Sequence, residues 1–482
     1  MGAPFHSLRH VAVLSLAALF AASAPSCTLT RVSTESCTKN DECLTAFGRG
    51  FTCGGGGRCV RAPAFARCDQ AYPPDFLTRP EVYPGGVLFG MLTTRSRSTH
   101  PPREAAVRLA IGQANDLGGV DGRKFGILSC DVSKDAKYDA LDESGAAVAA
   151  AAYLRDAMGV PAIIGPMASD PTLAVWNAVK GTGLLVISPS STSNALTQVD
   201  TATATDDEPG LLWRTAAPDA LQGASMAQYL AEQTPKVTKA TVIYAKGAYG
   251  EGLAQTFAKS FADRGGTADL LPFSNSGERD ADVIEAAKKA APFVVIIGQV
   301  DDAAACLNGT VGNAAFDKVS FLFTDTAGNT DFLDKTKSAA AAYPRVFGAR
   351  PATPTGDVFS LFSFSFRSAT GQDPAALTYV ANAYDAAWML MYGAAWVKGR
   401  GTELTGKNIA RGFRRIVSTG PEIAVEPNQF SRLKTAFEGD QRVNLRGASG
   451  TLDFDPTTEE TTTGIDIWSA ANSRIEIVKT YQ

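Results

Sequence analysis

Short apolar runs alternate with longer segments of helical character along most of this chain after residue 85. The apolar runs show no polar alternation, which is typical of strands that are covered on both faces. The predicted strands are residues 87–92, 125–130, 240–244, 293–298 and 319–323, and the predicted helices are residues 103–117, 140–158 and 250–265. Strands that alternate with helices predict doubly wound parallel sheets, and two successive sets predict an α/β protein with two such halves.

Two apolar runs continue directly into segments that are rich in hydroxyl side chains. One extends from Pro161 to Pro171, and the other from Gly183 to Asn194. Ser, Thr and Asp beside Pro predict a helix N-terminus after each strand. Such an end offers unpaired N–H groups and a partial positive charge, so it suits a carboxylate. Either segment alone is also consistent with an ordinary helix cap. The two together predict a ligand site at the carboxyl ends of the strands.

The composition is that of a globular chain with room for more than one domain. The 482 residues are 45% hydrophobic and 20% charged, with a net charge of -4 and a pI of about 5.6. The absence of a basic cluster argues against a nucleic-acid partner. Only His6, His10 and His100 are available, and the first two lie in a segment that we expect to be removed. This shortage argues against a histidine-based hydrolase or metal site, and we expect no cofactor.

The first residues have the layout of a secretion signal. Arg9 precedes an apolar stretch, residues 11–24, that is too short to span a bilayer. The stretch leads into Ala-Pro-Ser and then Cys27, which resembles the lipobox of bacterial lipoproteins. We therefore expect residues 1–26 to be a signal peptide and Cys27 to carry a lipid that holds the exported protein on the periplasmic side of a membrane. Plain cleavage a few residues earlier is the alternative.

Five of the eight cysteines fall within residues 37–68. This density in an exported chain predicts a small disulfide-stabilised module, and we assign residues 27–68 to the lipid anchor and this module. The candidates for disulfides are Cys37, Cys43, Cys53 and Cys59. Four cysteines allow three connectivities, and their spacing does not choose among them. A zinc site is the competing interpretation, although the spacings differ from those of zinc ribbons.

Cys68, Cys130 and Cys306 are not among these four disulfide candidates. Cys68 either pairs with Cys130 or Cys306 or stays free. The residues after Cys68 are rich in proline, so residues 69–84 predict a stiff linker before the main body of the chain.

Seven motifs follow one another from about residue 85 to the end of the chain. They are Ile164-Gly-Pro, Ile187-Ser-Pro-Ser-Ser-Thr192, Trp213-Arg-Thr-Ala-Ala-Pro-Asp219 with Gln222-Gly223, Ala248-Tyr-Gly-Glu-Gly-Leu253, Phe321 to Asn329, Tyr384-Asp-Ala386 and Gly450-Thr-Leu-Asp-Phe454. In this order they resemble the type I periplasmic binding proteins, in particular the branch that binds leucine, isoleucine and valine for ABC transporters. The resemblance implies two lobes joined by three crossover strands. It places residues 85–216 and 347–446 in the first lobe and residues 217–346 and 447–482 in the second.

The resemblance also implies a set of ligand-binding positions. In this family the carboxylate of an amino acid meets hydroxyl and N–H groups of the first lobe, and its ammonium meets an acid of the second lobe. The matching residues are Ser169, Ser190, Ser191 and Thr192 for the carboxylate, Asp325 with Asp219 for the ammonium, and Tyr249 with Gln299 for flanking contacts. A structural role is the alternative for each: helix caps, a turn aspartate or a core aromatic. Arg95, with Thr93 and Thr94, ends the first strand and is a candidate for a second acidic group on the ligand.

Together these observations predict an extracytoplasmic solute-binding lipoprotein rather than an enzyme. We expect it to bind an amino acid or a related small polar ligand between its lobes, as a monomer, and to deliver this ligand to ABC permease subunits. Its only membrane contact would be the lipid at Cys27. A ligand-sensing receptor of the same fold without a transporter is the alternative, and the cysteine-rich module favours it somewhat.

Overall fold

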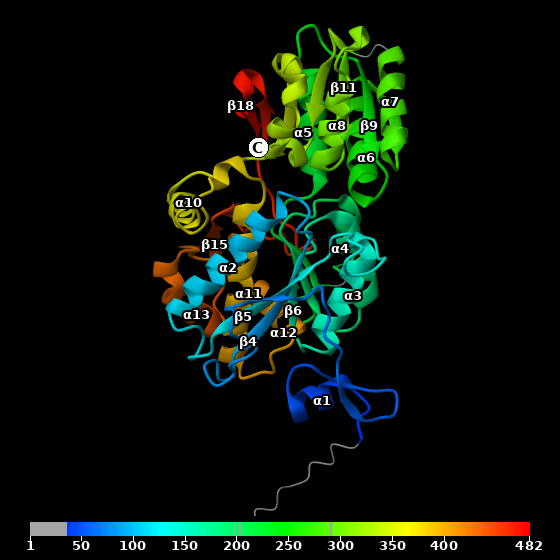
Figure 1. Ribbon diagram of the computed structural model, residues 1–482. Coiled ribbons are helices and arrows are strands. Elements are labelled where there is room, and N and C mark those ends of the chain that lie inside the picture. Colours follow the sequence, from blue (N-terminus) through cyan, green and yellow to red (C-terminus); the bar gives the residue numbers. More distant parts are fainter. Residues whose placement is uncertain (1–35, 198, 202–203, 290–291) are drawn as a thin grey trace, which may run out of the picture.

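The computed structural model describes residues 36–197, 199–201, 204–289 and 292–482. Figure 1 shows two lobes stacked end to end, with a small N-terminal module at the far end of the first lobe. The expected signal peptide, residues 1–26, and the expected lipid site, Cys27, lie outside the described residues. Within the described ranges, no helix combines the length and the apolar character that crossing a membrane requires.

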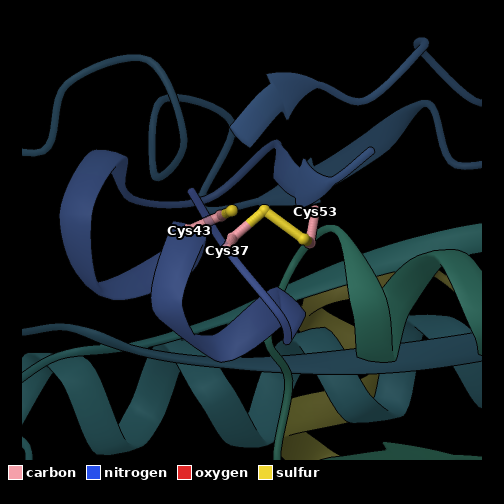
Figure 2. A group of neighbouring side chains, drawn as sticks. All are labelled: Cys37, Cys43 and Cys53. Carbon is pink, nitrogen blue, oxygen red and sulfur yellow. A yellow bond between two sulfur atoms is a disulfide. The ribbon is translucent and has the colours of Figure 1, made fainter. Parts of the chain in front are cut away.

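The N-terminal module consists of one helix and a two-stranded sheet. Helix α1 is Asn40–Phe47, and strands β1 (Phe51–Cys53) and β2 (Cys59–Arg61) are antiparallel. The four predicted cysteines form two disulfides, Cys37–Cys53 and Cys43–Cys59. Figure 2 shows the sulfur of Cys43 beside the Cys37–Cys53 disulfide. The sulfur atoms of these three cysteines all lie within 4.8 Å of one another. Disulfide bonding uses all of them, which disfavours the zinc interpretation.

The module is docked on the first lobe. The N–H of Gly50 donates to the carbonyl of Ala157 at 2.7 Å, and Arg49 donates to the carbonyl of Gly86 at 3.0 Å. Leu44 packs so closely on Gly159 that a Cβ at residue 159 would lie 2.9 Å from the leucine side chain. The module is therefore a fixed extension of the lobe.

Residues 69–84 are part of the first lobe, so the prediction of a linker was wrong. Strand β3 (Gln70–Tyr72) pairs antiparallel with β5 (Phe125–Asp131) at the edge of the sheet. Cys68 forms a disulfide with Cys130, which lies on β5. Cys306 is buried and unpaired. Phe76 is buried among the apolar side chains that cover the sheet. The aromatic residues of this segment thus have apolar partners, and the prolines shape turns instead of extending the chain.

The first lobe contains a six-stranded sheet in the order β3-β5-β4-β6-β7-β8, in which every strand except β3 is parallel to its neighbours. Its remaining strands are β4 (Val87–Thr93), β6 (Ala162–Ile164), β7 (Leu185–Ser188) and β8 (Leu212–Arg214), with a small sheet of β14 (Glu422–Ala424), β15 (Asn444–Gly447) and β16 (Gly450–Thr451). Its helices are α2 (His100–Asp116), α3 (Glu143–Asp156), α4 (Ser169–Val179), α10 (Asp357–Thr370), α11 (Val380–Arg400), α12 (Gly406–Phe413) and α13 (Phe430–Glu438). Two apolar clusters cover opposite faces of the sheet, one with α2 and α11 and the other with α3 and α4.

The second lobe contains a seven-stranded sheet in the order β10-β9-β11-β12-β13-β17-β18. The strands are β9 (Lys239–Ala245), β10 (Thr267–Phe273), β11 (Phe293–Ile297), β12 (Ser320–Phe323), β13 (Val346–Pro351), β17 (Ile465–Ser469) and β18 (Glu476–Tyr481). The helices are α5 (Asp219–Ala231), α6 (Ala248–Ala262), α7 (Ser276–Lys289), α8 (Val300–Asn308) and α9 (Thr330–Lys335). The first five strands are parallel to one another, and β17 is antiparallel to both of its neighbours, β13 and β18. The predicted α/β class with parallel-sheet lobes is thus confirmed.

The chain crosses between the lobes at residues 215–218, 352–356 and 461–464, and one pocket is lined by residues of all three crossings, including Thr215, Thr353 and Thr462. The last two crossings come later than expected. Strand β13 stays in the second lobe because it pairs with β12 and β17. The hairpin of β15 and β16 stays in the first lobe, where Phe454 packs edge-on against Trp213 with ring centroids 5.0 Å apart.

One of the two hydroxyl-rich segments leads into a helix as predicted, but without the predicted cap. Helix α4 begins at Ser169, and its N-cap is Ala168, which makes no side-chain cap hydrogen bond. The second segment leads only into a single 3-10 turn, Asn194–Leu196. Ser193 caps this turn, since its hydroxyl oxygen accepts the N–H of Ala195 at 3.2 Å. Ser188 instead bonds to a neighbouring loop: its hydroxyl donates to the Pro166 carbonyl at 2.6 Å. A second helix N-terminus is thus missing from the site that the sequence predicted.

Candidate ligand-binding cleft

A pocket lies between the lobes, at the carboxyl ends of strands from both sheets. The first lobe contributes Arg97, Thr99, His100, Arg103, Met167, Ala168, Ser169, Ser190, Thr378 and Tyr379, and the second lobe contributes Tyr249, Gln299, Val300, Asp301, Asp325 and Thr326. Most of these side chains are polar. A pocket of this kind suits a small ligand that is oriented by hydrogen bonds and charges.

Arg103, in the first turns of α2, supplies a buried positive charge. Its guanidinium donates to the Ser190 hydroxyl at 3.0 Å and to the Thr378 carbonyl at 3.2 Å. Its neighbours Arg97 and Arg108 form ion pairs with glutamates, whereas Arg103 has no ion pair among the described residues. Burial lowers the pKa of Arg103 to about 10, which leaves it charged at neutral pH. A buried cation with only neutral partners favours the entry of an anion.

Asp325 supplies the opposite charge from the second lobe. It follows β12 and is 2% exposed. Its Oδ1 accepts hydrogen bonds from the Tyr249 hydroxyl at 2.6 Å and from Gln222 Nε2 at 3.1 Å. Its Oδ2 accepts one from the Tyr379 hydroxyl at 2.8 Å. Tyr379 belongs to the first lobe, so this contact joins the two lobes across the pocket.

The two tyrosines are fixed as donors. Burial, and then the charge of Asp325, raise the pKa of both Tyr249 and Tyr379 well above the ordinary value. Tyr379 has a φ of 64°, in the left-handed region that is uncommon for a bulky side chain. Its ring also lies 5.2 Å from the Arg103 guanidinium carbon. The pocket therefore presents a cation on one lobe and a hydrogen-bonded carboxylate on the other.

The sequence model of a family described as periplasmic binding proteins matches residues 86–436 of this chain. The chain belongs to this family. The resemblance that the seven motifs predicted is thereby confirmed. Members of the family bind solutes and are not enzymes, so this periplasmic binding protein has a solute-binding role.

Two curated relatives illustrate the similarity. The chemotactic signal transduction substrate-binding protein BasB of Halobacterium salinarum is 26% identical over 364 residues, which cover 74% of this chain and 80% of the relative. The leucine-, isoleucine-, valine-, threonine- and alanine-binding protein of Pseudomonas aeruginosa is 27% identical over 254 residues, covering 52% of this chain and 63% of the relative. The match to the second relative thus spans less than two thirds of its length.

Solved structures support the fold. A leucine-binding protein of Thermotoga maritima superposes with a TM-score of 0.64 at 18% identity, covering 82% of this chain and 99% of that one. A solute-binding protein of R. palustris in complex with 4-hydroxybenzoate gives a TM-score of 0.62 at 13% identity, covering 82% and 97%. At these identities the likeness establishes the two-lobed architecture of this periplasmic binding protein and nothing about its ligand.

The four predicted carboxylate-binding residues fall into two pairs. Ser169 and Ser190 line the pocket. Ser191 and Thr192 are buried outside the pocket lining. The Ser191 hydroxyl lies 2.8 Å from that of Thr172, which ties the loop after β7 to α4. The Thr192 carbonyl accepts a hydrogen bond from the Asp219 N–H at 2.7 Å. The structure therefore gives Ser191 and Thr192 supporting positions.

The remaining predicted residues lie at or next to the pocket. Asp325, Tyr249 and Gln299 line it, and Gln299 also precedes α8, where its N–H donates to Asp302 at 3.1 Å. Asp219 does not line the pocket, but the charge of Asp325 raises its pKa. It is the first residue of α5 and not the helix cap, which is Pro218.

Arg95 does not face the pocket, contrary to the prediction for the end of the first strand. It forms ion pairs with Asp69 and Glu104 outside the pocket lining. Arg103 was not predicted, because its place near the start of an expected amphipathic helix is typical of a solvent-exposed residue. Tyr379 was not predicted either. Its position at the start of a long apolar helix is typical of a core aromatic.

His100 lines the same pocket in a neutral form. Its Nδ1 accepts the N–H of Thr94 at 3.2 Å. Burial lowers its pKa well below the ordinary value, and the charges of Arg103 and Arg97 act in the same direction. His100 is therefore neutral and has a structural role in this cleft, as the hydrogen-bond acceptor of the Thr94 N–H.

Proposed function

We propose that this periplasmic binding protein captures an amino acid or a related small zwitterion between its lobes. The observation that carries the proposal is the pair of opposite charges in one pocket, Arg103 on the first lobe and Asp325 on the second. A ligand carboxylate would accept from Arg103 and the Ser190 hydroxyl, and a ligand ammonium would donate to Asp325. A zwitterion then satisfies both charges and contacts both lobes at once.

The energies are compatible with this function. A hydrogen bond to a charged group contributes about 1.5–3 kcal/mol, and micromolar affinity corresponds to about 8 kcal/mol. Three or four such bonds therefore suffice after ordering costs. Because Tyr379 and Asp325 come from different lobes, a ligand that inserts between Arg103 and Asp325 would replace or extend an existing interlobe contact. Binding would thus be coupled to the relative position of the lobes.

Delivery to an ABC permease is the first proposed use of this binding. It is supported by the similarity to the amino-acid-binding protein of Pseudomonas aeruginosa. We further propose that a lipid at Cys27 holds the protein to a membrane. The docked module would then act as a rigid spacer, because it lies at the end of the first lobe that is remote from the second lobe (Figure 1).

A sensing role is the second candidate. It is favoured by the match to the chemotactic substrate-binding protein of Halobacterium salinarum, which covers 80% of that relative. The cysteine-rich module favours it as well, since a rigid module beside the lobe can present a surface to a receptor. A pull-down from membranes with ligand present separates the candidates: permease subunits support delivery, and a signalling receptor supports sensing.

The binding function is tested with a panel of amino acids, their amides and the corresponding amines. A specific ligand raises the melting temperature by mass action, and the amino acid should do so more than either analogue. In calorimetry, Asp325→Asn should weaken binding of the best amino acid by about 1.5–3 kcal/mol. Asp334→Asn, an exposed aspartate of the same lobe that pairs with Lys337, is the matched control. Unchanged affinity of Asp325→Asn would remove this residue from the site.

A further inference from the structure

A second buried carboxylate, that of Asp219, lies close enough to Asp325 for the charge of Asp325 to act on it. Asp219 is 1% exposed. Among the described residues, neither of its carboxylate oxygens has a hydrogen-bond partner of good geometry, although the Thr192 side chain lies beside it. Asp325 differs, since hydroxyl and amide donors occupy both of its oxygens. The cluster therefore contains one satisfied and one unsatisfied acid.

Burial and the nearby charge of Asp325 outweigh the groups that favour an anion at Asp219, which are the Thr192 side chain, Arg214 and the start of α5. Asp325, on the turn after β12, repels a charge on Asp219. A charge on Asp219 contributes to the raised pKa of Tyr249, from α6, and of Tyr379, at the start of α11. Both tyrosine hydroxyls, however, donate their hydrogen bonds to Asp325.

Arg214 on β8 is the one cation that lowers the pKa of Asp219 among its described neighbours. Its guanidinium is already engaged, because it pairs with Glu460 and donates to the carbonyls of Ser191 and Ser193. Burial, followed by the charge of Asp325, raises the pKa of Asp219 well above the ordinary value. Burial without a well-placed hydrogen-bond partner therefore favours the protonated form of the Asp219 carboxyl.

We propose that capture of an ammonium-bearing ligand drives a proton out of Asp219. This inference rests on the proposed function. In the step, the O–H bond of the Asp219 carboxyl breaks, its electron pair stays on the carboxylate oxygen, and the proton passes to solvent or buffer. The ligand ammonium keeps its own protons and lies against Asp325. There its positive charge offsets the repulsion that Asp325 would exert on an ionised Asp219, so ionisation of Asp219 becomes favourable.

The coupling makes binding dependent on pH. While Asp219 is protonated in the free protein and ionised in the complex, the affinity should rise about tenfold for each pH unit, because one proton is released per ligand. The affinity becomes constant above the free-state pKa of Asp219. The site would thus hold its ligand more tightly at neutral or alkaline pH than in acid.

Calorimetric titration of the full exported chain with L-leucine, L-threonine and L-alanine tests this. The affinity is measured from about pH 5 to about pH 9, and the binding enthalpy is compared at about pH 7.5 in phosphate and in Tris, two buffers with different ionisation enthalpies. The binding enthalpy should differ between the buffers by the amount that corresponds to about one proton released. Asp219→Asn should abolish this difference. The control Asp263→Asn, an exposed aspartate of the same lobe that pairs with Lys259, should retain it.

The outcomes separate the inference from the proposed function. Binding without proton release, or release that persists in Asp219→Asn, overturns the inference and leaves the binding function intact. Binding of none of the three probes, nor of any amino acid in the wider panel, overturns the binding function itself. Infrared difference spectra of the wild-type protein should show loss of a protonated carboxyl band on binding. This readout does not depend on whether the Asn variant folds.

Discussion

Replacing Arg103 by methionine separates a ligand-binding role from a structural role. Methionine keeps an unbranched side chain of similar bulk and removes the charge. The guanidinium now bonds only to neutral groups, Ser190 and Thr378, and forms no ion pair with a described residue. A ligand carboxylate would lose a charge-assisted interaction of about 1.5–3 kcal/mol, so Kd should rise about 10- to 150-fold.

The same substitution should have little effect on the unfolding of the ligand-free protein. Removing an unpaired buried charge relieves a desolvation cost, which offsets the hydrogen bonds that are lost. Ser190 also keeps a partner, because its hydroxyl donates to the Met167 carbonyl at 2.8 Å. We expect the free energy of unfolding to change by less than about 1 kcal/mol. Urea denaturation of the ligand-free variant measures this change.

Calorimetry with the amino acid and with its amide completes the test. The amide lacks the negative charge, so Arg103→Met should weaken its binding less than that of the amino acid. Arg108→Met on the same helix, where the arginine pairs with Glu104, should leave both affinities unchanged. Equal losses for amino acid and amide, or no loss for either, would refute the assignment of the carboxylate to Arg103.

Two further predictions concern the cleft and the edge of the first lobe. Tyr249→Phe removes the hydroxyl that donates to Asp325 at 2.6 Å. The free energy of ligand binding, measured by calorimetry, should weaken by about 0.5–1.5 kcal/mol. An unchanged Kd would contradict a role for this contact in binding. Replacing Cys68 and Cys130 together by serine opens a loop of 62 residues. The free energy of unfolding, measured by urea titration under oxidising conditions, should fall by about 4 kcal/mol. Equal stability of the variant and the wild type would argue against this disulfide.

Local signals predicted the architecture well, because each apolar run must be covered on both faces wherever it lies. The strand expected at residues 87–92 is β4, and the strand expected at residues 293–298 is β11. The lobe boundaries were harder, since they depend on which sheet a strand joins. Strand β13 has no local feature that assigns it to the second lobe, and only its pairing with β12 and β17 does so.

The candidate site was predictable in part. Ser190, Asp325 and Tyr249 come from segments whose order resembles the family, and all three line the pocket. Arg103 was not predictable, because its helical position is compatible with a solvent-exposed side chain, and only its burial against Ser190 and Thr378 reveals a role. The prolines after Cys68 were misleading because composition does not show the pairing of β3 with β5.

The family motif Tyr384-Asp-Ala386 has a structural role in this protein. Asp385 is buried in α11 and accepts hydrogen bonds from the N–H groups of Ala448 and Ser449 at 2.9 and 2.8 Å. It thereby fixes the turn between β15 and β16 to the core of the first lobe. Its carboxylate lies outside the pocket lining, so its place in the motif reflects packing.

A crystal structure with the best amino acid of the panel bound tests the central claim most directly. We predict that the ligand lies between the lobes, with its carboxylate within hydrogen-bond distance of Arg103 and Ser190 and its ammonium against Asp325. A ligand bound outside this pocket, or bound with its ammonium toward Arg103, would contradict the account.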